Sequence, residues 1–328
     1  MMMKELRWGM IGCGDVTEVK SGPAFNRVPH SKLLAVMCRT PGRAEDYAAR
    51  HRISKWYQDG AELIADPEIN AIYIATPPDS HLIYTEMAAE AGKPVYVEKP
   101  MARNYSECLK MIGICEKYDV PLFVAYYRRC LPKFQTVRKL LHSGRIGTVR
   151  TVMITLHLSP REEDFNRENL PWRVLPEVAG GGYFVDLASH QLDLLDYLIA
   201  PIAKAKGIAK NQAGLYPAED LVLAIFHFEN DIAGSGNWCF TVSPDNQLDR
   251  MEIIGSKGKL EFSAFDDSPV RLSHQSGTEE FSDIWPQHVH QPLVETVVRE
   301  LLGSGKCPST GISAARTSRV MDQILGKI

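Results

Sequence analysis

The sequence predicts an α/β protein of two domains, the first built on a parallel sheet and the second on mostly antiparallel strands. The chain has 328 residues, which is more than one compact core usually holds. Its first third alternates short apolar strands with helical patterns. Beyond about Pro132 strands dominate, and several of them alternate polar and apolar residues with a period of two.

The elements of the first third follow a strand–helix rhythm. We expect strands at residues 6–11, 32–38, 71–75, 94–97 and 121–125, and helices at 42–51, 80–91 and 104–118. This order indicates βαβ units and a parallel sheet. In an open α/β sheet ligands bind at the carboxyl ends of the strands, so the turns that leave these strands are expected to carry the chemistry.

The remainder of the chain is richer in strands. After a helix at 133–142 we expect strands at 149–158, 203–209, 221–228, 232–240, 248–254 and 259–262, and helices at 183–199, 290–302 and 311–325. The rhythm changes near Arg128, which predicts domains at residues 1–127 and 128–328.

The composition excludes several classes of protein. Hydrophobic residues make up 45% and charged residues 23%, which excludes a disordered or collagen-like chain. The net charge of −3 leaves no broad basic excess for binding nucleic acid. The apolar runs are strand-sized, far below the roughly 20 residues that span a bilayer, and the start shows no signal-peptide pattern.

Cysteines and histidines give no sign of a disulfide framework or a metal site. The seven cysteines are odd in number and lack a CxxC pair, so we expect reduced thiols in a cytoplasmic protein. His288 and His290 are closely spaced, but no cysteine or acidic cluster beside them completes four ligands. We therefore expect no bound metal.

A glycine-rich turn follows the first strand. Glycines in such a turn let backbone N–H groups approach a pyrophosphate, and the following helix adds positive potential. The expected cofactor contacts are Gly12, Cys13, Gly14, Asp15 and Val16. The third glycine of the usual pattern is replaced by Thr17, and Gly22-Pro23 is expected to break the first helix early.

The end of the second strand indicates which dinucleotide binds. An NAD-binding domain usually has Asp or Glu here, to bond the ribose hydroxyls. This chain has Cys38-Arg39-Thr40, and Arg43 follows in the first turn of the next helix, where a cation is electrostatically unfavourable. The pair of arginines favours the 2′-phosphate of NADP(H); the alternative is two solvated surface arginines.

A lysine follows the strand at 94–97. Pro100 ends that strand and can hold Lys99 in one direction, and X–Pro bonds are sometimes cis in such turns. A lysine beside a cationic nicotinamide ring would suit proton donation or hydrogen bonding to a substrate oxygen. Taken alone, Lys-Pro is an ordinary loop.

The helix at 183–199 follows Gly180-Gly181-Gly182. Asp186, His190, Asp193 and Tyr197 fall on one stripe of this helix. A carboxylate one turn before an imidazole can orient it and raise its basicity, which suits general acid–base work near neutrality. The alternative is a solvated polar face with a surface Asp–His pair.

Together these segments resemble the glucose–fructose oxidoreductase/inositol dehydrogenase (Gfo/Idh/MocA) family over essentially the whole chain. The segments that carry the resemblance are Gly12-Cys13-Gly14, Thr76-Pro77-Pro78 with His81, Glu98-Lys99-Pro100, Trp172-Arg173 and the run from Gly180 to His190. The resemblance implies a doubly wound Rossmann domain at 1–127, followed at 128–328 by a substrate-binding and oligomerisation domain with a large open sheet.

The resemblance also implies a reaction and a set of site residues. The reaction is hydride transfer between a nicotinamide cofactor and a hydroxyl or carbonyl carbon of a sugar, inositol or related diol. The implied catalytic group is Lys99, Asp186 and His190. Besides residues 12–16 of the glycine-rich turn and Cys38, Arg39, Thr40 and Arg43 after the second strand, further cofactor contacts are expected. They are Thr76, Pro77, His81, Glu98, Lys99, Arg128, Trp172 and Arg173.

The chain departs from the family where an Asn-Arg-Phe-like segment is common. It reads Tyr126-Tyr127-Arg128 here, which puts the local contacts in doubt. We expect Tyr126 to bind substrate, together with Lys99, Asp186 and His190. The alternative is that both tyrosines are buried sheet-end residues.

The predicted mechanism joins these groups. Lys99 and His190 bond to the reacting oxygen, His190 takes the hydroxyl proton during oxidation, and Asp186 bonds His190 or a neighbouring hydroxyl. Two alternatives remain: a glycosidase in which the bound cofactor transiently oxidises a sugar, and a cofactor-sensing regulator without turnover.

The second domain is also expected to bind another copy of the chain. Its strands carry Ile225, Phe226, Trp238 and Phe240, which are too many apolar residues for one buried face. A second apolar face predicts a homodimer or homotetramer through this sheet. The alternative is helices on both faces.

Overall fold

The computed structural model describes residues 4–328, which form two compact units. The first unit runs to Ala102 and also contains Ser106–Tyr127 and Pro286–Ala315. The second comprises Arg103–Tyr105, Arg128–Trp285 and Arg316–Ile328. The chain therefore returns to its first unit near the C-terminus, which the strand–helix rhythm does not reveal.

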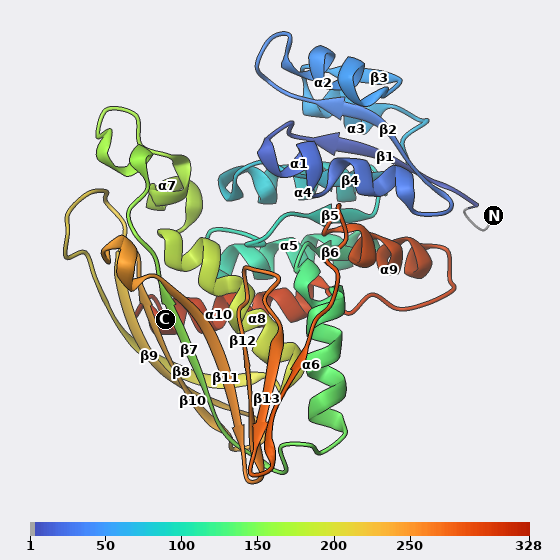
Figure 1. Ribbon diagram of the computed structural model, residues 1–328. Coiled ribbons are helices and arrows are strands. Elements are labelled where there is room, and N and C mark those ends of the chain that lie inside the picture. The colour runs from blue at the N-terminus through green and yellow to red at the C-terminus, as the bar shows by residue number, and fades with distance from the viewer. Residues whose placement is uncertain (1–3) are drawn as a thin grey trace. The chain divides into compact units, whose positions relative to one another are not determined.

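The first unit is built on a six-stranded sheet in the order β3-β2-β1-β4-β5-β6, in which every neighbouring pair is parallel (Figure 1). The strands are β1 (Leu6–Ile11), β2 (Ser31–Met37), β3 (Lys55–Tyr57), β4 (Ala71–Ile74), β5 (Val95–Val97) and β6 (Leu122–Val124). This order is that of a doubly wound Rossmann sheet, as predicted.

Helices connect these strands. They are α1 (Asp15–Val19), the 3-10 helix η1 (Gly22–Arg27), α2 (Arg43–His51), α3 (Gly60–Ala65), the 3-10 turn η2 (Pro78–Ser80), α4 (His81–Glu90), α5 (Tyr105–Lys117) and, from near the C-terminus, α9 (Gln291–Leu301). The break predicted at Gly22-Pro23 is confirmed. The short elements β3 and α3 were not predicted, because three and six residues are too few to show a period.

Four aromatic side chains form the core on one side of this sheet. Trp8, Phe25, Tyr73 and Tyr96 are all fully buried. The rings of Tyr73 and Tyr96, which are paired across β4 and β5, stack at 5.1 Å, and Phe25 lies 5.0 Å from Tyr73. The hydroxyl groups of the two tyrosines need polar partners in this setting.

The second unit is built on an eight-stranded sheet in the order β14-β13-β12-β11-β7-β10-β9-β8 (Figure 1). The strands are β7 (Val149–His157), β8 (Ile202–Lys210), β9 (Leu221–Phe228), β10 (Ala233–Cys239), β11 (Leu248–Gly255), β12 (Gly258–Phe262), β13 (Val270–His274) and β14 (Gly277–Phe281). The β7–β10 pair is parallel and the other pairs are antiparallel, which confirms the predicted mostly antiparallel sheet. The sequence did not predict β13 and β14, which are short and polar.

The predicted uniform helix at 183–199 is wrong in its first part. Residues Phe184–Ala188 form the π-helix η6, and a regular helix, α8, covers Ser189–Leu198. The other helical elements of this unit are α6 (Pro132–His142), η4 (Glu162–Phe165), η5 (Trp172–Val174), α7 (Pro176–Ala179), η7 (Pro244–Asn246) and most of α10 (Gly311–Ile324). Asp186 lies within the wider π-turn, so the α-helical spacing does not describe its relation to His190.

The two faces of the large sheet differ. Phe226 and Trp238 are buried, and Trp238 Nε1 donates a 2.7 Å hydrogen bond to Gln191 of α8, so α8 covers their face. Ile225 points the other way and is 67% exposed, with Ile208 and Leu223 also exposed. Of the four residues that predicted a second apolar face, Phe226, Trp238 and Phe240 are buried in one chain and only Ile225 lies on the exposed face.

A buried ion-pair network holds α8 in the second unit. Arg129 donates to both carboxylate oxygens of Asp193, at 2.8 and 2.6 Å, and lies 3.7 Å from Asp196. Arg316 of α10 donates to both oxygens of Asp196, at 2.9 and 2.5 Å. The predicted stripe of Asp186, His190, Asp193 and Tyr197 is therefore not a solvent-exposed face of the helix.

Removing one partner of this network is expected to destabilise the protein strongly. Asp193→Ala leaves the 3% exposed Arg129 side chain with one fewer carboxylate, so the free energy of unfolding should fall by about 3–5 kcal/mol. Asp46→Ala, which breaks the surface pair with Arg50, should cost about 0–1 kcal/mol. Urea unfolding followed by circular dichroism measures both, and equal losses would contradict the assignment.

No helix among residues 4–328 is both long and apolar enough to cross a membrane.

Candidate functional site

The turn after β1 brings backbone to the carboxyl edge of the sheet. Gly12 has φ +106°, and a Cβ there would lie 2.7 Å from the carbonyl oxygen of Ala75, so the close approach of β1 and β4 requires glycine. A Cβ at Gly14 would meet nothing within 4 Å. The open surface at Gly14 fits the cradle that a pyrophosphate needs.

Thr17 explains how the loop closes without a third glycine. Its hydroxyl donates to the carbonyl of Gly14 at 2.6 Å, and its own carbonyl accepts the Tyr47 hydroxyl at 2.6 Å. The helix that follows is only five residues long, so its dipole adds less than the sequence suggested. Cys13 is buried, its thiol donates to the carbonyl of Met37 at 3.6 Å, and burial raises the pKa of that thiol to about 12.

Three arginines lie near the ends of β2 and α2, and they differ in their partners. Arg50 donates to Glu18 at 2.7 Å, and this hydrogen bond lowers the pKa of Glu18 to about 2. Arg39 and Arg43 are exposed, and the structure of residues 4–328 shows no ion pair for either. These two cations are the ones predicted to meet a phosphate.

Arg39 also lines a hollow of about 280 Å³ beside the end of β2. Asp59, which caps α3, and Tyr84 of α4 lie in the same wall. Burial raises the pKa of the Tyr84 hydroxyl, while Arg39 opposes that shift. The hollow therefore combines an apolar ring with one cation and one carboxylate.

His81 ties two of the predicted turns together. Its ring is fully buried, with Nε2 2.8 Å from the carbonyl of Thr76 and Nδ1 3.1 Å from that of Met101. Burial lowers the pKa of this imidazole. The contacts that the structure gives His81 are thus with the chain itself, between the turn after β4 and the segment after Pro100.

The turn after β5 has the conformation that the sequence allowed for, with a cis Lys99-Pro100 bond. The Glu98 carboxylate is buried, accepts the Tyr73 hydroxyl at 2.5 Å on Oε1 and accepts the Lys99 N–H at 3.2 Å on Oε2. Burial raises the pKa of Glu98. Glu98 therefore binds the turn from inside, and the Lys99 side chain is half-buried at the sheet edge.

The second unit presents the other predicted polar groups. The Asp186 carboxylate lies 3.3 Å from Nε of Arg173, whose guanidinium covers the ring of Trp172 at 4.5 Å. His190 is 4% exposed and meets the ring of Phe265 edge-on at 6.0 Å. The catalytic group predicted from the motifs is divided: Lys99 belongs to the first unit, and Asp186 and His190 belong to the second.

The glycines ahead of η6 have a packing role. Gly180 has φ +82°, and a Cβ there would lie 2.1 Å from the carbonyl oxygen of Arg103. The N–H of Gly182 donates to Glu219 at 3.0 Å. The triplet thus fixes the entry to the π-turn that carries Asp186.

The segment after β6 is buried. Tyr126 is 1% exposed, and the rings of Tyr127 and His290 lie 4.4 Å apart at an angle of 31°, so the imidazole covers part of the Tyr127 ring. Arg128 donates to the carbonyl of Ala264 at 2.8 Å and lies over the ring of Phe265. Roles for Tyr126 in substrate binding and for Arg128 in cofactor binding stay predictions.

His288 and His290, which the sequence analysis did not include in the site, lie close to the predicted site residue Glu98. Nδ1 of His288 donates to the carbonyl of Val19 at 2.6 Å, and His290 lies beside Tyr96 and Glu98. Sequence reasoning missed these contacts because the pair lies nearly 200 residues beyond Glu98. Residues 4–328 contain no cluster of three or more His, Cys, Asp or Glu that could hold a metal, and all seven cysteines are free thiols.

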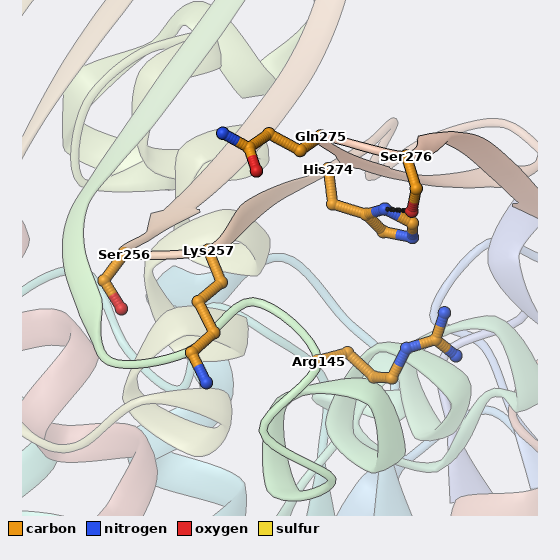
Figure 2. A pocket seen from close by; sticks show the side chains of 6 residues that line it. All are labelled: Arg145, Ser256, Lys257, His274, Gln275 and Ser276. Carbon is orange, nitrogen blue, oxygen red and sulfur yellow. Dashed lines mark hydrogen bonds between the residues drawn. The ribbon is translucent and has the colours of Figure 1, made fainter.

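A second hollow, of about 680 Å³, lies at the strand turns of the large sheet (Figure 2). Its lining residues are Arg145, Ser256, Lys257, His274, Gln275 and Ser276. His274 Nε2 lies 2.9 Å from Glu279, which also pairs with Arg145. No predicted site residue lines this hollow, so we do not place the reaction there.

Comparisons with known proteins identify both parts of the chain. The family model for the oxidoreductase family with an NAD-binding Rossmann fold matches residues 6–126, and the GFO/IDH/MocA C-terminal domain matches residues 134–261. The chain is 36% identical over 327 residues to Oxidoreductase P35 of Formosa agariphila, covering 99% of this chain and 100% of that one.

Two more relatives extend the comparison. D-xylose 1-dehydrogenase [NADP(+)] of Haloarcula marismortui is 27% identical over 84% of this chain and 78% of its own. A levoglucosan dehydrogenase solved with NADH and levoglucosan superposes with a TM-score of 0.88 at 22% identity, over 98% of this chain and 96% of that one, which shows a shared fold. The chain is therefore a member of the Gfo/Idh/MocA family of oxidoreductases, with a nicotinamide-dinucleotide-binding Rossmann domain.

Proposed function

We propose that this protein is an NAD(P)-dependent dehydrogenase or reductase that acts on a CH–OH group of a sugar, an inositol or a related diol. The observation that carries the proposal is the carboxyl edge of the first sheet, where the open surface at Gly14 and the lysine at position 99 both lie at strand ends. The relatives that act on D-xylose and levoglucosan support the substrate class.

The dinucleotide would be held by backbone and side-chain groups at the carboxyl edge of the first sheet. The backbone of residues 12–16 fits the pyrophosphate, and Thr76 and Pro77 border the same edge after β4. Trp172 and Arg173 are further predicted contacts from the second unit. When bound, the nicotinamide ring supplies the hydride acceptor or donor.

The chain's own residues handle the proton. In oxidation His190 takes the proton of the substrate hydroxyl, while the C–H bond gives up hydride and a carbonyl forms. The Lys99 ammonium donates a hydrogen bond to the reacting oxygen and stabilises negative charge that develops there. Asp186, anchored by Arg173, orients His190 or a neighbouring hydroxyl. In reduction, His190 returns the proton.

Loss of either proton-handling side chain should reduce turnover. A screen of sugars, inositols and diols with NADP⁺ and NADPH, followed by absorbance of the reduced ring, identifies a substrate. With it, Lys99→Ala and His190→Ala should each lower kcat by about 10² or more. The exposed residues Lys110 and His142 supply the matched controls Lys110→Ala and His142→Ala, which should match the wild type. Near-normal kcat in both site variants would reject the assignment.

We propose that NADP(H) is the preferred dinucleotide. Arg39 and Arg43 are exposed without ion pairs in residues 4–328, and Arg50 is occupied by Glu18, so the first two are free to meet the 2′-phosphate. The relatives include an enzyme named for NADP⁺ and one solved with NADH, so the family alone leaves the preference open.

Removing these charges should weaken NADP⁺ binding selectively. The double variant Arg39→Ala/Arg43→Ala should raise the Kd for NADP⁺ by about tenfold or more and change the Kd for NAD⁺ less than twofold. Fluorescence titration measures both, with the exposed Arg27→Ala as the control. Tighter binding of NAD(H) than of NADP(H) by the wild type would overturn the preference.

We propose that the exposed face of the large sheet pairs with a second copy of the chain. Ile208, Leu223 and Ile225 lie on neighbouring strands β8 and β9 and are 59%, 39% and 67% exposed. An apolar stripe of this kind is typical of an interface.

The free thiols support the predicted cytoplasmic location.

A charge on this stripe should dissociate the oligomer. Ile225→Asp should lower the mass found by analytical ultracentrifugation at micromolar concentration to that of one chain. Ile312→Asp, at an exposed position of α10, should leave the mass unchanged. A monomeric wild-type protein would count against the interface.

A further inference from the structure

The segment that begins at Pro286 returns to the first unit and is fixed there by its two histidines. His288 Nδ1 donates to the carbonyl of Val19 at 2.6 Å, and the N–H of His290 donates to the carbonyl of Lys20 at 3.2 Å. Helix α9 begins at Gln291 and continues away from this point. The position of the His290 ring is therefore set by two contacts with the end of α1.

The ring of His290 lies between aromatic and acidic groups. It is fully buried, and its centre lies 4.4 Å from that of the Tyr127 ring, to which it is tilted by 31°. Its Nδ1 lies 3.3 Å from the hydroxyl of Tyr96 and 3.7 Å from Oε1 of Glu98. Glu98 Oε1 also accepts the hydroxyl of Tyr73, whose ring stacks on Tyr96, so His290 and Tyr73 both lie at one carboxylate oxygen.

The other oxygen of that carboxylate reaches the turn that carries the proposed catalytic lysine. Glu98 Oε2 accepts the backbone N–H of Lys99 at 3.2 Å. A rotation of the carboxylate would break this contact together with the one to Tyr73. The direction of the Lys99 main chain is therefore linked, through a single buried side chain, to the position of His290.

We propose that His290 is a positioning residue for the reaction: it fixes the Glu98 carboxylate and thereby the turn from which Lys99 projects. The inference rests on the proposed role of Lys99. It adds a residue from a distant segment that none of the motifs contains and that lies beyond both family-model matches.

The charges around Glu98 predict how the contact between His290 and Glu98 affects the pH dependence of kcat. The groups that face it are Lys99, Lys20, Tyr73, Tyr96 and His290, with Tyr127 behind the imidazole. Burial raises the pKa of Glu98, and the two lysines and the Tyr73 hydrogen bond lower it. Replacing the imidazole by an apolar ring removes a polar neighbour, so the pKa of Glu98 should rise and the carboxylate should be lost at a higher pH.

The test uses the full-length enzyme with a substrate found in the screen. His290→Phe keeps a ring against Tyr127 and should lower kcat about tenfold, because small errors in placing a reacting group are costly. KM and the Kd for NADP⁺ should change less than twofold, and the acidic limb of the kcat profile should move up by about half a pH unit or more. His290→Asn, which restores an N–H near Nδ1, should recover most of the loss.

Three further variants separate positioning from folding. Glu98→Gln should reduce kcat at least as much as His290→Phe, and the double variant should be no worse than Glu98→Gln alone, because both act through one contact. His288→Phe loosens the segment at Val19 but keeps the imidazole of His290, so it should lower the melting temperature and move the pH profile less than His290→Phe does. If His290→Phe fails to fold, His290→Leu, which also removes both ring nitrogens, gives the kcat and pH readouts in its place.

Each outcome decides the proposal. Wild-type kcat and pH profile in His290→Phe, or additive losses in the double variant, would overturn it. Lys99→Ala distinguishes the two levels of inference: retained turnover there would reject the proposed function, whereas a large loss there with an unaffected His290→Phe would reject the positioning role only.

Discussion

Two carboxylates inside the second unit impose the main constraint on its architecture. Asp193 and Asp196 are buried on α8, where an unpaired charge would be strongly unfavourable. Each therefore has to meet its arginine, one just before α6 and the other on α10. Because the bonds are bidentate, they fix the rotation of α8 as well as its position. His190 lies on the same helix and inherits that orientation.

The first unit also buries a carboxylate, that of Glu98, and holds it with different partners. Glu98 is buried with a tyrosine hydroxyl, a backbone N–H and an imidazole nearby. The aromatic rings of Tyr73 and Tyr96 are part of the core, while the Tyr73 hydroxyl reaches the carboxylate and the Tyr96 hydroxyl lies 3.3 Å from Nδ1 of His290. The hydrophobic core and the turn that carries Lys99 are thus built from the same side chains.

Much of this fold could be predicted from the sequence, because a regular spacing of apolar residues distinguishes its long helices and strands. The strand at Leu6–Ile11 was predicted to the residue, and the expected helices at 42–51, 104–118 and 133–142 match α2, α5 and α6 within one residue at each end. The early end of the first helix followed from Gly22-Pro23. The antiparallel nature of the second sheet followed from alternation in strands such as β9, which is buried at every second residue.

What the sequence did not reveal depends on contacts between distant residues. Alternation within β9 cannot say which face α8 covers, so Ile225 was grouped with Phe226, Trp238 and Phe240, which lie on the opposite, buried face. A π-turn at Phe184–Ala188 has no periodic signal that distinguishes it from the first turn of an α-helix. The pair His288 and His290 looked incidental because its partners, Val19, Tyr96 and Glu98, are remote in the chain.

The buried ring of His81 can bond to only one of its two neighbouring carbonyl groups at a time, depending on its tautomer. Both ring nitrogens face carbonyl oxygens, but a neutral imidazole has one N–H, and burial disfavours the doubly protonated ring. One carbonyl must therefore face a nitrogen lone pair at any moment. The shorter contact favours the Nε2–H form, which holds the turn at Thr76, while the Nδ1–H form would hold Met101 instead. The one N–H of a neutral His81 can therefore bond to the carbonyl of Thr76 or to that of Met101, but not to both at once.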